Sequence, residues 1–131
     1  MIPYWMSRTE LMLGQENINA LMGKNVLIIG LGGVGGICAE MIARAGVGKM
    51  TIVDNDTIDL SNINRQIPAL HSTAEQSKAQ VLGARLKDIN PELDLTILEI
   101  FIKEDLTRDL LDSTKWDYVV DCIDTLSAKT F

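Results

Sequence analysis

The stretch VLIIGLGGVGG, residues 26–36, runs from an apolar, strand-forming segment through a glycine-rich turn into a helical pattern. Gly30 permits the tight turn, Gly32 lets backbone N–H groups approach a phosphate, and Gly35 lets the following helix pack closely on the strand. The first turn of such a helix also offers unpaired N–H donors and a partial positive charge. The stretch therefore predicts a site for the phosphates of a nucleotide.

An acidic residue follows the next strand of the pattern. The apolar residues 50–53 predict a second strand, and Asp54 comes directly after it. A carboxylate at this place is typical of nucleotide sites, where it binds the hydroxyl groups of a ribose. A glycine turn alone can also serve packing only, so its combination with Asp54 is what favours a nucleotide.

Strands and helices alternate along the rest of the chain. We expect a helical lead-in over 7–22, strands over 25–29, 50–53, 95–102 and 116–123, helices over 33–45, 74–89 and 106–111, and a long polar loop over 55–73. With right-handed crossovers, this βαβαβ order predicts an α/β fold with a Rossmann-like, doubly wound, mainly parallel sheet. Its strands would stand in the order third, second, first, fourth. The site would lie at the carboxyl ends of the first, second and fourth strands.

Length and composition limit the class of protein. A chain of 131 residues is small for a complete doubly wound enzyme, so we expect a lead-in over 1–24 and a nucleotide-binding portion over 25–131 that is incomplete at its C-terminus. The net charge of −6 provides no basic surface for nonspecific binding of nucleic acids. No apolar run approaches the roughly 20 residues that span a bilayer. Two cysteines are too few for a disulfide framework. We therefore expect a cytoplasmic protein without membrane contact.

Three charged residues extend the predicted site. Arg65 lies in the long loop, where its planar guanidinium suits phosphate oxygens, although a solvated arginine is an equally good interpretation of that residue alone. Lys78 stands near the start of a predicted helix, where a positive charge is unfavourable unless a phosphate binds there; the alternative is a surface lysine. Asp124 follows the fourth strand and could hold Mg²⁺. We interpret Asp56 and Asp59 as turn residues that bind their own backbone.

Together these motifs resemble the ThiF/MoeB/HesA family, relatives of the ubiquitin-activating enzymes. The resemblance covers residues 8–124, and its carriers are the glycine turn, AGVG at 45–48, Asp54, LSNINRQ at 60–66, Lys78, INP at 89–91 and DCID at 121–124. Within the family, segments 8–14 and 64–71 are most similar to the dehydratase branch, which acts on threonylcarbamoyladenosine of tRNA.

The resemblance implies an enzyme that binds MgATP and adenylates a carboxylate with release of pyrophosphate. The implied acceptor is the threonylcarbamoyl group of tRNA, which is then cyclised by dehydration. The implied site residues are Gly30, Gly32, Gly33 and Gly35 at the phosphate turn, Asp54 on the ribose, Asn62, Arg65 and Lys78 on the phosphates, and Asp124 on Mg²⁺. The family often takes a catalytic arginine from the N-terminal segment of a partner subunit, so a homodimer is implied, with Arg8 as the candidate to act beside Arg65 and Lys78.

Other functions stay open at this point. The same family includes enzymes that adenylate the C-terminal Gly-Gly of a ubiquitin-like sulfur-carrier protein in molybdopterin or thiamine biosynthesis. An NAD-dependent oxidoreductase would explain the glycine turn and Asp54, but not Arg65 with Lys78. A noncatalytic nucleotide-binding module would suit the short length, and we expect residues 1–131 to be inactive alone.

Overall fold

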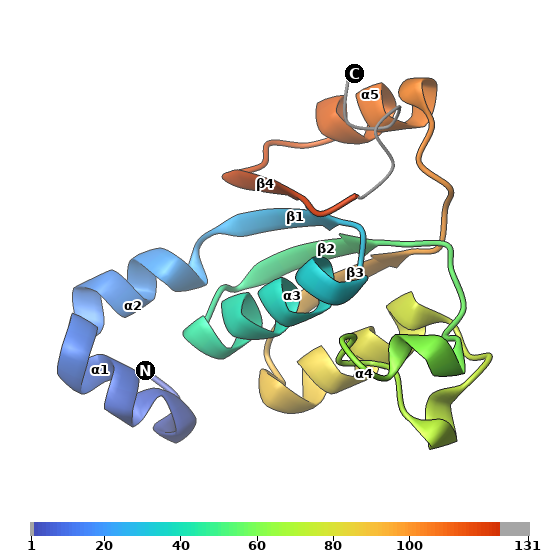
Figure 1. The fold of residues 1–131 in the computed structure, drawn as a ribbon. Helices are drawn as coiled ribbons and strands as arrows, with labels where there is room; N and C mark the ends of the chain where they lie inside the picture. Colours follow the sequence, from blue (N-terminus) through green and yellow to red (C-terminus); the bar gives the residue numbers. More distant parts are fainter. Residues whose placement is uncertain (1, 124–131) are drawn as a thin grey trace.

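Four parallel strands form the centre of the structure, a computed structural model that describes residues 2–123 (Figure 1). They are β1 (Asn25–Ile29), β2 (Lys49–Val53), β3 (Asp94–Leu98) and β4 (Tyr118–Asp121). Their order across the sheet is β3-β2-β1-β4, so the predicted order is confirmed. All three neighbouring pairs are parallel.

Helices cover both faces of the sheet, as right-handed crossovers on the two sides of β1 require. The helices α3 (Gly33–Ala45) and α4 (Lys78–Ile89) enclose the larger core on one face, and α5 (Glu104–Asp112) closes a smaller core on the other. Val26 and Leu27, adjacent residues of β1, belong to opposite cores. β1 is therefore buried on both faces, which explains why its sequence is apolar without alternation.

Two element boundaries differ from the prediction by four residues, and the others by two or fewer. α4 begins at Lys78, not at residue 74, because Ser77 is extended and caps the helix; its Oγ accepts a backbone N–H of the first turn at 3.3 Å. β3 ends at Leu98, not at residue 102. Leu98 lies opposite Val53, the last residue of β2, so no strand remains for the following residues to pair with. Residues 100–102 instead line a cavity.

The N-terminal helices α1 (Ser7–Leu13) and α2 (Gln15–Met22) lead into β1 at the amino ends of the strands (Figure 1). They are separated at Gly14, whose φ of +82° lies in the region that favours glycine. Met6, just before α1, is buried against Gly46, whose φ of +103° ends α3 in the left-handed region. In the described part of the chain, no helix is long and apolar enough to cross a membrane.

Candidate nucleotide-binding site

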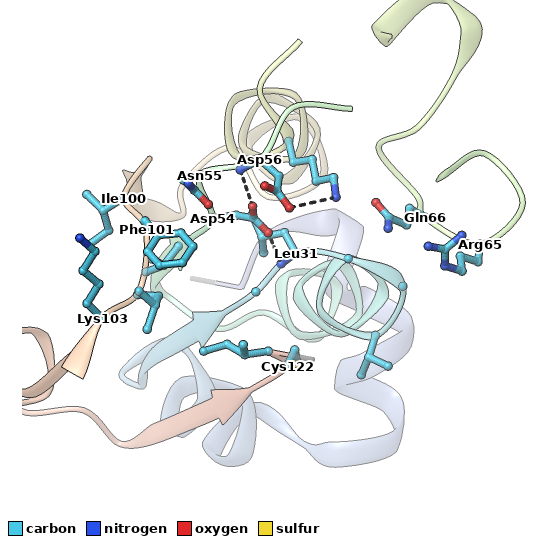
Figure 2. Close-up of a pocket in the computed structure, with 18 of the residues that line it drawn as sticks. Leu31, Asp54, Asn55, Asp56, Arg65, Gln66, Ile100, Phe101, Lys103 and Cys122 are labelled. Atoms are coloured by element: carbon cyan, nitrogen blue, oxygen red, sulfur yellow. Dashed lines mark hydrogen bonds and ion pairs between the residues drawn. The ribbon is translucent and has the colours of Figure 1, made fainter. Parts of the chain in front are cut away.

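A cavity of about 720 Å³ opens at the carboxyl ends of β1, β2 and β4 (Figure 2). Its wall comes from the glycine turn, the end of β2, the long loop with the start of α4, and the segment between β3 and α5. The lining residues are Gly30, Leu31, Gly32, Gly33, Val34, Val53, Asp54, Asn55, Asp56, Arg65, Gln66, Lys78, Ile100, Phe101, Ile102, Lys103, Glu104, Cys122 and Ile123. The fold therefore brings most of the predicted site residues to one place.

The glycines of the turn serve two different purposes. Gly30 has a φ of +92°, and a Cβ there would stand 2.8 Å from the carbonyl oxygen of Cys122. A Cβ on Gly35 would overlap the carbonyl oxygen of Gly30, so these two glycines are required by the protein itself. At Gly32 and Gly33 the nearest atoms that a Cβ would meet belong to the side chains of Gln66 and Arg65, at ordinary distances of 3.5 and 3.6 Å. Packing therefore does not explain those two glycines, whereas close approach of a ligand would.

Asp54 joins the glycine turn to the long loop. Its Oδ2 accepts the backbone N–H of Leu31 at 2.8 Å, and its Oδ1 accepts the backbone N–H of Asp56 at 2.7 Å (Figure 2). Both carboxylate oxygens are thus fixed in place, and each keeps lone-pair capacity for a further donor. A carboxylate held in this way can accept hydrogen bonds from ribose hydroxyls, and the ribose role predicted for Asp54 stays a prediction.

Two cations reach the cavity from the loop and from α4. The side chain of Lys78 is only 8% exposed, and its Nζ lies 3.8 Å from Oδ2 of Asp56. The interpretation of Lys78 as a surface lysine is therefore wrong. Asp56, predicted to be only a turn residue, also pairs with Lys78. Arg65 lines the cavity as an exposed side chain, held by bonds from its Nη1 to the carbonyl of Ser61 at 3.3 Å and to Oδ1 of Asn64 at 2.9 Å.

The long loop is shaped by its own polar side chains. Asp59 caps the short 3₁₀ turn Leu60–Asn62: its carboxylate accepts from the hydroxyl and the backbone N–H of Ser61, which lower the pKa of Asp59. The turn role predicted for Asp59 is confirmed. Oδ1 of Asn62 accepts the backbone N–H of Asp59 at 2.9 Å, and Asn62 does not line the cavity among the described residues. Its contact with phosphates stays a prediction.

One wall of the cavity does not follow from the sequence. Figure 2 shows Ile100, Phe101 and Lys103 on one side of Asp54, and Gln66 on the other. Residues 100–102 continue the apolar pattern of the third strand, so the sequence alone predicts strand there. Their placement instead provides an apolar surface beyond the end of β2.

Besides Asn62, three predicted site residues are not among the described residues that line the cavity: Gly35, whose place in the turn is given above, Arg8 and Asp124. Arg8 is exposed on α1, at the amino ends of the strands and away from the cavity (Figure 1). A single chain therefore does not bring it to the site. Asp124 lies outside the described residues, so the prediction that it holds Mg²⁺ is not tested by the structure.

Comparison with known proteins adds independent information. A profile of the ThiF family matches residues 6–131. The tRNA threonylcarbamoyladenosine dehydratase of Bacillus subtilis (strain 168) is 42% identical over 123 residues, which make up 94% of this chain and 48% of that protein. The sulfur carrier protein ThiS adenylyltransferase of Escherichia coli (strain K12) is 37% identical over 109 residues, 83% of this chain and 43% of that protein.

Solved structures agree with these matches. The crystal structure of the E. coli tRNA N6-threonylcarbamoyladenosine dehydratase TcdA in complex with ATP has a TM-score of 0.90 and 33% sequence identity, over 95% of this chain and 51% of that chain. This chain spans about half the length of the curated relatives that it matches. Sequence motifs, strand order and these similarities lead to one assignment: the chain belongs to the ThiF family.

Proposed function

We propose that the full-length protein binds ATP in this cavity and uses it to adenylate a carboxylate. The observation that supports this most is the order of groups across the cavity: Ile100 and Phe101 lie on one side of Asp54, and Arg65 lies on the other (Figure 2). The glycine turn and Lys78 line the same cavity. A nucleoside triphosphate presents its base, ribose and phosphates in the same order. Two cations at the phosphate end favour a triphosphate over NAD, whose pyrophosphate carries less charge.

The residues have separate tasks in this proposal. Asp54 accepts hydrogen bonds from the ribose, while Gly32 and Gly33 leave room for the phosphates. A carboxylate oxygen of the acceptor attacks the α-phosphorus and forms the acyl adenylate. Pyrophosphate leaves, and negative charge develops on its leaving oxygen. Arg65 and Lys78 stabilise that charge as it develops. We also assign Asn62 to the phosphates, through its amide nitrogen, because its amide oxygen is engaged within the loop.

Mg²⁺ suits this site as a companion of the nucleotide. Among residues 2–123, no three His, Cys, Asp or Glu side chains are grouped so that they could hold a metal ion. Mg²⁺ needs no such group, since it commonly takes one or two carboxylates and completes its shell with phosphate oxygens and water. We propose Asp124 as the carboxylate ligand. The bound ion would neutralise phosphate charge.

The proposed acceptor is the threonylcarbamoyl carboxylate of a modified adenosine in tRNA. Its adenylate then cyclises with departure of AMP, so that the modified base has lost the elements of water. The support is the 42% identity to a tRNA threonylcarbamoyladenosine dehydratase. The second candidate is the C-terminal carboxylate of a sulfur-carrier protein, supported by the 37% identity to a ThiS adenylyltransferase. Both candidates use the same adenylation chemistry and differ in the acceptor.

We further propose a cytoplasmic homodimer in which Arg8 of one subunit reaches the phosphates of the other. The exposure of Arg8 on α1, away from the cavity of its own chain, supports a contribution in trans. In this proposal residues 1–24 form the lead-in that carries Arg8 and residues 25–131 form the ATP-binding portion. We expect residues 1–131 alone to be inactive.

Two measurements on the full-length protein test these assignments. Titration calorimetry should show binding of MgATP, and tight binding of NAD without ATP would refute the nucleotide assignment. Exchange of labelled pyrophosphate into ATP should depend on tRNA that carries threonylcarbamoyladenosine. Exchange that depends instead on a sulfur carrier ending in Gly-Gly would favour the second candidate. If neither acceptor supports exchange, both candidates are refuted.

A further inference from the structure

Gln66 is a buried polar residue of the cavity that has no task in the function proposed above. It is 8% exposed and lines the cavity. Its Oε1 is shielded from solvent and has no hydrogen-bond partner. Among the described residues only Asn25 shares this property, and Asn25 lies at the amino end of β1, far along the strand from the cavity.

The backbone holds Gln66 firmly in this position. Its N–H donates to the carbonyl of Asn62 at 2.9 Å, and its own carbonyl accepts the N–H of Ala69 at 3.0 Å. The side chain extends to the glycine turn, where Nε2 lies 3.5 Å from the point that a Cβ on Gly32 would occupy. The amide group therefore stands against the part of the turn that packing alone does not require to be glycine.

An amide is an unfavourable choice for this place in the protein without ligand. A buried amide whose oxygen has no donor is less stable than an apolar side chain of the same length, which would fill the space equally well. A hydrogen bond from Nε2 to an ionised phosphate would offset this cost, because Nε2 carries two N–H donors and a phosphate offers only acceptors. The contact is made by Nε2 and not by Oε1. Arg65, the preceding residue, enters the same cavity and is the cation assigned to the phosphates.

We propose that Gln66 is a further nucleotide-binding residue, whose side-chain amide donates a hydrogen bond to a phosphate oxygen that docks over Gly32. This inference rests on the proposed function. It also gives a reason for glycine at position 32: a Cβ there would stand between the amide of Gln66 and the phosphate.

The test compares ligands that share the nucleoside and differ in phosphates. Dissociation constants for MgATP, AMP and adenosine are measured by calorimetry on the full-length wild type, Gln66→Met and Gln66→Glu, at pH 8. Gln66→Met keeps the length of the side chain and removes the donor, whereas Gln66→Glu also adds negative charge. Gln15→Glu, an exposed position on α2, is the control for the same charge change away from the cavity.

We expect Gln66→Met to raise the dissociation constant of MgATP about tenfold and that of adenosine less than twofold. This is the effect expected for the loss of one hydrogen bond to a charged group. Gln66→Glu should weaken the binding of MgATP further, and Gln15→Glu should leave the binding of all three ligands unchanged. A similar loss of affinity for AMP would place the contact on the α-phosphate. A loss of affinity for ATP alone would place it on the β- or γ-phosphate.

Equal losses for ATP and adenosine would show that the amide only packs on the turn, and this would overturn the inference. Unchanged ATP binding in both variants would overturn it as well, while leaving the proposed function intact. If the wild type binds adenosine and not ATP, the proposed function fails first, and the role of Gln66 fails with it.

Discussion

Gly35 and Gly36 are neighbours at the start of α3, and the structure predicts opposite effects when each is replaced by alanine. A Cβ on Gly35 would fall more than 1 Å inside the 3.0 Å that real Cβ atoms keep from other atoms, and the atom it meets is the backbone carbonyl oxygen of Gly30. A Cβ on Gly36 would meet only the carbonyl oxygen of Leu31 and Cδ of Pro68, both at an ordinary 3.5 Å.

The two substitutions therefore form a matched pair. Gly35→Ala must push α3 away from the turn, and because overpacking costs about 1–3 kcal/mol even where side chains can move, we expect a loss of about 3 kcal/mol or more against backbone. Gly36→Ala should be neutral or stabilise by up to about 1 kcal/mol, since alanine is the better helix former. The free energy of unfolding in urea, followed by circular dichroism on the full-length protein, gives both values. The same proteins should show loss of ATP binding for Gly35→Ala only. If the two variants unfold within about 1 kcal/mol of each other, the packing argument for Gly35 is wrong.

Three further predictions concern named side chains. Asp54→Asn should raise the KM for ATP about tenfold and lower kcat much less, because ribose contacts are the same in the ground and transition states; a kcat effect alone would refute this role. Arg65→Ala should lower kcat about 10²-fold in a pyrophosphate-release assay, since Arg65 is proposed to stabilise the charge that develops as pyrophosphate leaves. A change in KM alone would contradict this role. Glu40 of α3 is buried and paired with Arg85 of α4 and Arg44 of α3, and these pairs hold the pKa of Glu40 below its ordinary value. Their stabilisation is complete at neutral pH and is lost as the pH falls below 4.5 through the folded-state pKa. Glu40→Gln should therefore lower the free energy of unfolding by about 1–3 kcal/mol at pH 7, with a difference from wild type that shrinks in acid.

The order of the strands could be predicted from the sequence because each strand is a short apolar run with a helix between it and the next. Right-handed crossovers leave few ways to arrange such units. The boundaries were less predictable. Residues 100–102 are apolar like the strand before them, and only the register, in which Leu98 meets the last residue of β2, shows where pairing stops.

The site could be predicted where a residue follows a strand end directly and where its type has a known task at such an end. The glycine turn and Asp54 belong to this group, because both follow directly from a strand end. Gln66 and Lys103 do not, since nothing in their local sequence indicates that they face a cavity. Their positions depend on how the long loop and the segment after β3 fold back over the ends of the strands, which is tertiary information.

The surroundings of Lys78 explain why a lysine can begin a helix here. Its charge lies at the unfavourable end of the helix dipole, and its side chain is 8% exposed. Asp56 offsets both penalties, because its carbonyl accepts the N–H of Lys78 at 3.1 Å and its carboxylate lies 3.8 Å from the ammonium. That carboxylate is 68% exposed, so solvent screens the attraction and the pair is loose. A triphosphate carries more charge than one carboxylate and can therefore displace Asp56 from the ammonium. In the proposed function, Asp56 thus holds the side chain of Lys78 in position until the nucleotide binds, without competing strongly once it does.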